Sequence, residues 1–226
     1  MGDMRVARRL LPAAVLAGSL IVAAPAPARI IEVGKTAEEP VPSCPPRPCQ
    51  AMTRTTGYQA KVGSERETMV APADGKIVAW TVTLSRPGNT QRKFFTENFG
   101  GPPSAGITIL RPGKRLFSRV TGRSPVQPLD PYLGQTVQFP LGRALNVRKG
   151  YIIALTVPTW APVLSLGLPA ETSWRAARKL EDNGCNRLGS QTAQQNLGSV
   201  TQYRCLYKTA RLTYTATLIT TPKSRN

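Results

Sequence analysis

The stretch "KIVAWTVTL", residues 76–84, decides the fold class, because its apolar and polar side chains alternate with a period of two. One face of the extended chain would carry Val78, Trp80, Val82 and Leu84. The opposite face would carry an alanine and two threonines. Such alternation is typical of a strand that packs on a core with one face and meets water with the other. The stretch therefore predicts a half-buried β-strand.

Three further segments alternate in the same way and are rich in β-branched and aromatic residues: "GITIL" (106–110), "YIIALTV" (151–157) and "RLTYTATLI" (211–219). In the second of these, Tyr151, Ile153, Leu155 and Val157 would share a face. Turn-forming runs such as "APADG", "RPGK" and "DNG" separate the segments, and no segment has a sustained helical period. The pattern predicts an all-β protein with antiparallel sheets arranged as a two-sheet sandwich.

A resemblance rests on "APADGKIVAW" (71–80), "ITILRPG" (107–113) and "NVRKGYIIAL" (146–155). These motifs resemble those of uncharacterised secreted bacterial β-sandwich proteins, which have a turn followed by a strand with a tryptophan. The resemblance covers about residues 44–220 and implies a jelly-roll-like sandwich. It implies no activity and assigns no functional residue.

Residues 1–28 have the features of a secretory signal peptide. Arg5, Arg8 and Arg9 precede the apolar run "LLPAAVLAGSLIVAA" (10–24), which ends near the cleavage-type sequence "APA" (26–28). The run is shorter than the ~20 residues that a membrane-spanning helix needs. We expect an exported protein, secreted or associated with the cell envelope, with no transmembrane segment after cleavage. Residues 29–53 would form an extended, proline-rich lead-in, and residues 54–221 the sandwich.

The charge is strongly positive. The chain has 30 basic and 12 acidic residues, a net charge of +18 at pH 7. After cleavage, 27 basic and 11 acidic residues would remain, which gives +16. Such a charge favours anionic partners: nucleic acid, wall polymers or an anionic membrane surface. We expect no specific nucleic-acid partner, and the oligomeric state stays open. A compositional bias toward arginine would give the same charge without any binding function, and this alternative stays open.

The chain contains no histidine. This excludes serine and cysteine hydrolases that use an imidazole base, and zinc sites with histidine ligands. Glu97 and Glu171 are acids without an obvious turn role, but no spacing pairs two carboxylates as a glycosidase requires. We expect no catalytic residue, no metal ligand and no cofactor.

The four cysteines are Cys44, Cys49, Cys185 and Cys205, and in an exported protein they predict two disulfides. A redox role is disfavoured because prolines between Cys44 and Cys49 prevent a helix through that motif. We expect a local bridge between these two residues and a second bridge between Cys185 and Cys205. A bridge from either N-terminal cysteine to the C-terminal pair is the alternative.

The basic stretch "RPGKRLFSRVTGR" (111–123) is the first candidate binding site. If residues 114–120 form a strand, Arg115, Phe117 and Arg119 share one face, and Arg123 follows them. An alternation of arginine and phenylalanine could form an exposed stripe for an anionic polymer, with the ring as a stacking partner. The same charges could instead protect an edge strand from pairing with other strands.

Trp160 is the second candidate. It lies in "VPTWAPV", between prolines, where a loop is predicted and where an exposed indole could stack on a sugar ring. A tryptophan that closes one end of the sandwich is the alternative. Together the candidates favour a non-enzymatic protein that binds an anionic or glycan polymer at the cell envelope. A carboxylate-based polysaccharide hydrolase and a self-assembling envelope component are the rival hypotheses.

Overall fold

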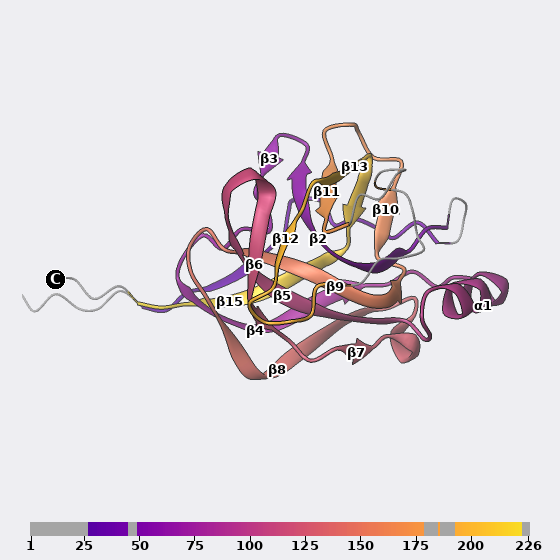
Figure 1. The fold of residues 1–226 in the computed structure, drawn as a ribbon, viewed down its shortest axis with the longest axis horizontal. Coiled ribbons are helices and arrows are strands. Elements are labelled where there is room, and N and C mark those ends of the chain that lie inside the picture. The colour runs from indigo at the N-terminus through magenta and orange to yellow at the C-terminus, as the bar shows by residue number, and fades with distance from the viewer. Residues whose placement is uncertain (1–26, 45–48, 179–184, 186–192, 223–226) are drawn as a thin grey trace, which may run out of the picture. The chain divides into compact units, whose positions relative to one another are not determined.

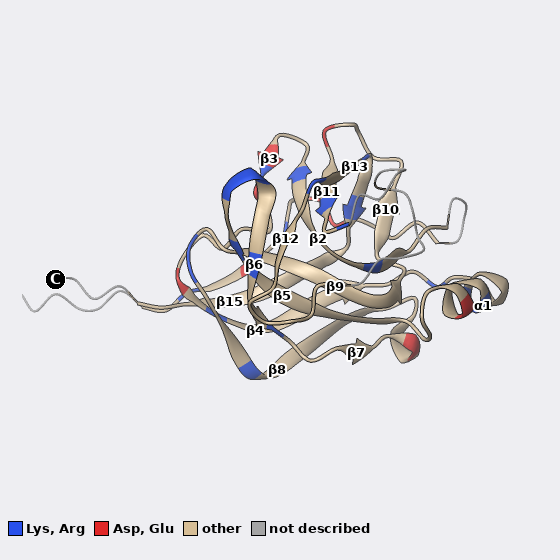
Figure 2. Cartoon of the chain, in the orientation of Figure 1, with Lys and Arg blue, Asp and Glu red and all other residues tan. Residues whose placement is uncertain are grey.

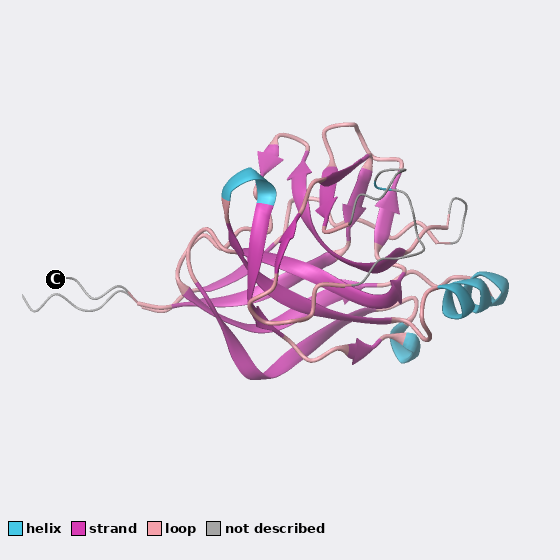
Figure 3. Ribbon diagram, in the orientation of Figure 1, coloured by secondary structure: helices cyan, strands magenta, loops and turns pink. Residues whose placement is uncertain are grey.

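The computed structural model describes residues 27–44, 49–178, 185 and 193–222. The predicted signal peptide lies outside the described residues, apart from its last two positions. Within the described part, the residues between Ala28 and Thr221 belong to one unit, in which antiparallel strands dominate (Figures 1 and 3).

The smaller sheet has four strands and contains both termini of the unit (Figure 1). Its order is β1 (Ile30–Val33), β15 (Tyr214–Thr220), β4 (Gly75–Thr83) and β8 (Thr136–Val147). The stretch that opens with Lys76 is β4, a central strand with β15 on one side and β8 on the other. Because β1 pairs with β15, β-structure begins inside the predicted lead-in rather than at residue 54.

The larger sheet is antiparallel as well. Its order is β12 (Val200–Gln202), β6 (Phe117–Arg123), β5 (Ser104–Pro112), β9 (Ile152–Ala161), β2 (Met52–Val62), β11 (Ser173–Ala176) and β13 (Cys205–Lys208). Two short strands extend it, β3 (Glu65–Arg66) beside β2 and β7 (Gln127–Pro128) beside β5. A separate two-stranded sheet joins β10 (Leu164–Leu166) to β14 (Ala210–Leu212).

The main core lies between the sheets. Trp80 and Val82 of β4 and Tyr214 of β15 are buried together with Ile107 and Ile109 of β5. Trp80 and Val82 alternate on this face as the period of two predicts. Val78 does not share the face, contrary to the prediction, because the pairing of β4 with β8 shifts between Ile77 and Ala79, and Ile77 is buried in the core in its place. The antiparallel two-sheet sandwich is confirmed.

The outer face of the larger sheet is also covered. Leu110, Val120, Ile152 and Ala154 pack there beneath Tyr203, which belongs to the segment before β13. All side chains from Ile152 to Val157 are therefore buried, although the alternation predicted only a half-buried strand. Strands that are covered on both faces have apolar residues at both sets of alternate positions, which explains the run of isoleucine, alanine and leucine.

The α-helix α1 (Asn89–Asn98) was not predicted. The side chain of Gln91 accepts a hydrogen bond from the Gly88 N–H at 2.7 Å and so supports the first turn. Phe95, inside the helix, and Phe99, directly after it, are four residues apart and both are buried. Gly100 and Gly101 then have positive φ values and end the helix. Among the described residues, no helix is long and apolar enough to cross a membrane.

Both expected disulfides are present. Cys44 is bonded to Cys49, with 4.6 Å between their Cα atoms, and Cys185 is bonded to Cys205, with 5.5 Å. The local pairing is confirmed, and no cysteine is free. The described residues contain no cluster of three or more cysteine or carboxylate side chains suited to a metal ion.

Candidate functional site: the basic β5–β6 hairpin

Strands β5 and β6 form a hairpin whose tip differs from the predicted strand over 114–120. The chain turns through Gly113 and a single 3-10 turn, Lys114–Leu116, and β6 begins only at Phe117. Arg115 therefore lies in the turn and not on the strand. Arg115 and Leu116 have φ values of +51° and +64°, in the left-handed region. This conformation costs on the order of 1–2 kcal/mol for each residue that is not glycine.

The strained tip is held by hydrogen bonds from the neighbouring segment. The side-chain amide of Gln202 donates to the Arg115 carbonyl at 2.8 Å. The backbone N–H of Tyr203 donates to the Leu116 carbonyl at 2.9 Å. Within the turn, the Gly113 N–H donates to the Phe117 carbonyl at 2.7 Å. The two residues in the unfavourable conformation are thus fixed from outside the hairpin, so the tip has a defined shape.

Two arginines face each other across the hairpin. Arg111 of β5 is the register partner of Arg119 of β6, so both side chains lie on the same face of the sheet, and both are exposed. Like charges at directly opposed positions destabilise a β-sheet. The Arg119 guanidinium donates to the Gly198 carbonyl at 2.7 Å, which holds it in place. Neither Arg111 nor Arg119 forms an ion pair with a described residue.

A β-bulge removes Arg123 from this face. Val120 pairs with Leu110 and Gly122 pairs with Ile109, so Thr121 is an extra residue without a register partner. Arg123 is consequently opposite Thr108, on the outer face of the sheet. The predicted stripe through Arg115, Arg119 and Arg123 is therefore divided between a turn and two faces.

Lys114 and Arg111 take the place of Arg123. We define the basic hairpin cluster as Arg111, Lys114, Arg115 and Arg119, all of them exposed. Phe117 lies on the same face as Arg119, two positions along β6, and its side chain is 43% exposed. Figure 2 shows Lys and Arg gathered at this turn between β5 and β6.

The edge-strand explanation of these charges does not hold. Strand β6 pairs with β5 on one side and with β12 on the other, where Val200 is opposite Arg119 and Gln202 opposite Phe117. An interior strand needs no charged side chains to prevent pairing with another chain.

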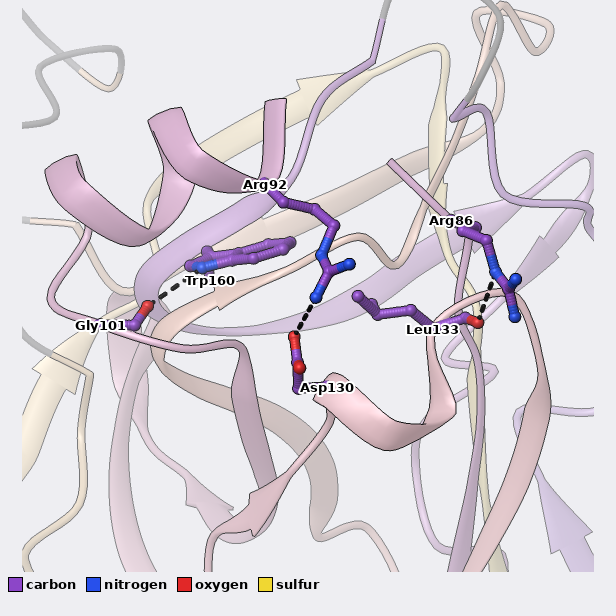
Figure 4. Close-up of polar contacts among 6 residues, drawn as sticks. All are labelled: Arg86, Arg92, Gly101, Asp130, Leu133 and Trp160. Carbon is purple, nitrogen blue, oxygen red and sulfur yellow. Dashed lines mark hydrogen bonds and ion pairs between the residues drawn. The ribbon is translucent and has the colours of Figure 1, made fainter. Parts of the chain in front are cut away.

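Trp160 is not a surface residue, contrary to the prediction. It lies in β9 and is fully buried, with its ring centroid 5.0 Å from that of Phe95 in α1. Its indole N–H donates to the Gly101 carbonyl at 3.1 Å (Figure 4). Trp160 therefore anchors α1 to the outer face of the larger sheet and cannot stack on a glycan.

The two acids without a turn role lie on separate elements. Glu97 lies on α1 and Glu171 in the turn before β11, and both are exposed. A shallow hollow beside α1 contains Glu97 and Asp130, but Lys93 and Arg92 form ion pairs with them (Figure 4 shows Arg92 and Asp130).

Comparison of the chain with protein-family models, with curated proteins and with solved structures found no match.

Proposed function

We propose that this is an exported, non-enzymatic β-sandwich protein that binds an anionic polymer of the cell envelope through the basic hairpin cluster. The observation that carries the proposal is the direct opposition of Arg111 and Arg119 on one exposed face. A phosphate or carboxylate bound between the two guanidinium groups would replace their repulsion with charge-assisted hydrogen bonds.

The shape of the hairpin supports this function. Its tip is held in a strained conformation by Gln202 and Tyr203, and strained backbone is frequent at binding sites. Phe117 adds an exposed ring beside the charges. The two disulfides are typical of exported proteins. Because Trp160 is buried, the proposal concerns anionic groups and not the stacking of sugar rings.

The test is the affinity of the mature protein for a soluble polyanion, heparin, at low salt, measured by isothermal titration calorimetry. The variant Arg111→Ser/Arg115→Ser/Arg119→Ser should bind about tenfold or more weakly, because each lost contact is a charge-assisted hydrogen bond. The matched control removes three exposed basic side chains elsewhere, Lys93→Ser/Arg123→Ser/Arg143→Ser.

The control should retain most of the affinity. Equal losses in the two triple variants would show that only net charge matters, and would overturn the assignment of the site. If the unaltered protein failed to bind heparin even at low salt, the proposed function itself would be rejected.

A further inference from the structure

Exposed apolar side chains gather around the basic hairpin cluster. Among the described residues, ten large apolar side chains are exposed, and four of them lie in the hairpin or in the segment beside it. They are Leu116 and Phe117, 41% and 43% exposed, and Leu197 and Val200, 63% and 48% exposed. Single exposed apolar side chains are ordinary on a protein surface, whereas a group of them marks a contact with another protein or with a membrane.

Strand pairing and a hydrogen bond bring these side chains close to the charges. Val200 of β12 is directly opposite Arg119 of β6, so the two share a face of the sheet, and Phe117 lies on that face two positions along β6. Leu197 precedes Gly198, whose carbonyl accepts a hydrogen bond from the Arg119 guanidinium at 2.7 Å. Apolar and cationic groups therefore lie side by side on one small surface.

This surface lies at one end of the larger sheet. The chain enters β5 after α1 and leaves it through the turn Lys114–Leu116, so this turn and α1 are at opposite ends of the strand (Figure 1). The hydrogen bonds from Gln202 and Tyr203 fix the backbone of the turn. A turn that is fixed in advance presents its side chains to a flat partner without the entropic cost of ordering a loop.

The combination of groups suits an anionic lipid surface better than a soluble polymer. Anionic headgroups attract lysine and arginine side chains, and the boundary between headgroups and acyl chains accepts apolar side chains. A soluble polyanion would engage the basic hairpin cluster but would leave Phe117, Leu197 and Val200 in water, where their exposure is unfavourable.

We infer that the basic hairpin cluster docks on a lipid layer with anionic headgroups, with Phe117, Leu197 and Val200 inserted between the headgroups. The cationic side chains meet the headgroup phosphates, and burial of the apolar side chains adds affinity that charge alone does not give. The inference rests on the anion binding proposed for the hairpin and specifies that the anionic groups lie on a lipid surface.

The test compares binding to heparin with binding to vesicles of equal parts phosphatidylcholine and phosphatidylglycerol, measured by vesicle sedimentation. The unaltered mature protein should bind these vesicles at least about tenfold more tightly than vesicles of pure phosphatidylcholine, which carry no net charge. Phe117→Ser/Leu197→Ser/Val200→Ser should weaken binding to the anionic vesicles by about tenfold or more, because it removes the apolar surface that is buried there. Its heparin affinity should change by less than about twofold, because the four basic side chains remain.

The matched control replaces an exposed phenylalanine, leucine and valine outside this surface, Phe94→Ser/Leu206→Ser/Val41→Ser. It should bind both the anionic vesicles and heparin as the unaltered protein does. Only the first triple variant should therefore separate the affinity for vesicles from the affinity for heparin.

A fluorescence measurement locates the contact without removing apolar surface. Phe117→Trp adds an exposed indole at the hairpin, whereas the native Trp80, Trp160 and Trp174 are buried. Vesicles that contain a brominated phosphatidylcholine should quench the added fluorescence, because bromine on the acyl chains quenches only an indole that reaches them. Phe94→Trp, on α1 at the opposite end of β5, is the control and should show no added quenching.

Three results would overturn the inference and leave the proposed function intact. They are equal vesicle affinities of the two triple variants, no vesicle binding by a protein that binds heparin, and no quenching of Phe117→Trp. The first result would mean that charge alone is recognised, as on a soluble polymer. If the unaltered protein bound neither heparin nor the vesicles, the proposed function would be rejected together with this inference.

Discussion

Arg211 of β14 and Arg119 of β6 both lie on β-strands and both donate to backbone carbonyls, but their surroundings differ. Arg211 is only 6% exposed, and its guanidinium donates to the Gly34 and Glu38 carbonyls and to the Thr36 hydroxyl. Arg119 is exposed and makes one such bond, to Gly198. The hydrogen bonds of Arg211 stabilise the fold. The guanidinium of Arg119 still has N–H groups that can donate to a partner.

The contacts of Arg211 also explain why the lead-in is ordered after β1. They hold residues 34–38 against β14, far along the chain. Burial lowers the pKa of Arg211, and the nearby Glu65, Glu39 and Glu38 oppose this shift. Buried guanidinium groups with several backbone partners act structurally, so the two classes of arginine should respond differently to mutation.

Replacement of Arg211 should give the largest effect on stability. Arg211→Ala removes a nearly buried guanidinium and leaves the buried Gly34 carbonyl without this donor, and it should lower the free energy of unfolding by about 2–4 kcal/mol. Arg111→Ala, the exposed control, should lower it by less than about 0.5 kcal/mol. Urea unfolding of the two variants measures the difference. Similar values for both would show that burial does not distinguish the two classes.

Loss of a disulfide should have the next largest effect on the free energy of unfolding. In the chain-entropy model, loss of the Cys185–Cys205 bridge, which spans 20 residues, should cost about 3 kcal/mol. Loss of the Cys44–Cys49 bridge, which spans 5, should cost about 2 kcal/mol. Unfolding of the two double-alanine variants measures these values. Loss of the Cys44–Cys49 bridge should leave heparin affinity unchanged, because neither cysteine lies in the hairpin or in the segment that holds its tip. Loss of the Cys185–Cys205 bridge should weaken binding more, because Cys205 follows Gln202 and Tyr203, which hold the tip, by only two or three residues. Equal affinities for the two variants would contradict a role for these residues in fixing the shape of the tip.

A smaller effect should appear at alkaline pH. Burial raises the pKa of Tyr203 and of Tyr214 well above the ordinary value of 10.0. The folded state keeps both phenols neutral, whereas the unfolded chain loses their protons above about pH 10. The stability that they confer is fully present below this pH and is lost as the pH rises toward the folded-state values.

The free energy of unfolding should therefore fall between pH 9 and pH 11. Tyr214→Phe removes the hydrogen bond to the Ile153 carbonyl and should cost about 1 kcal/mol at pH 8. The same variant should lose less stability than the unaltered protein between pH 9 and pH 11. If the variant and the unaltered protein lost the same amount of stability between pH 9 and pH 11, the Tyr214 phenol would not contribute to the pH dependence.

The sequence predicted the parts of the fold in which alternation is simple. Strands β4 and β15 and both disulfide pairings follow from spacing and residue type. The burial of β9 on both faces was missed, because its cover comes from Tyr203, far along the chain. Helix α1 was missed because it is short, although Phe95 and Phe99 and the two glycines that follow were a usable signal.

The candidate site was predicted only in part, for two physical reasons. The bulge at Thr121 leaves the alternation of β6 intact in the sequence, so only the register with β5 shows that Arg123 changes face. Pro158 made the region of Trp160 look like a loop. The structure places it between Val157 and Trp160, where the pairing of β9 with β2 is irregular, so the strand continues past the proline.

The central claim is that the basic hairpin cluster contributes charge for binding and not for folding. The most direct test is the salt dependence of heparin affinity between 50 and 200 mM NaCl, measured alongside urea unfolding. The slope of log Kd against log salt reflects the number of anionic groups that the protein neutralises. For Arg111→Ser/Arg115→Ser/Arg119→Ser we predict a slope reduced by about 2–3, and a free energy of unfolding changed by less than about 1 kcal/mol. A slope equal to that of Lys93→Ser/Arg123→Ser/Arg143→Ser would contradict the claim.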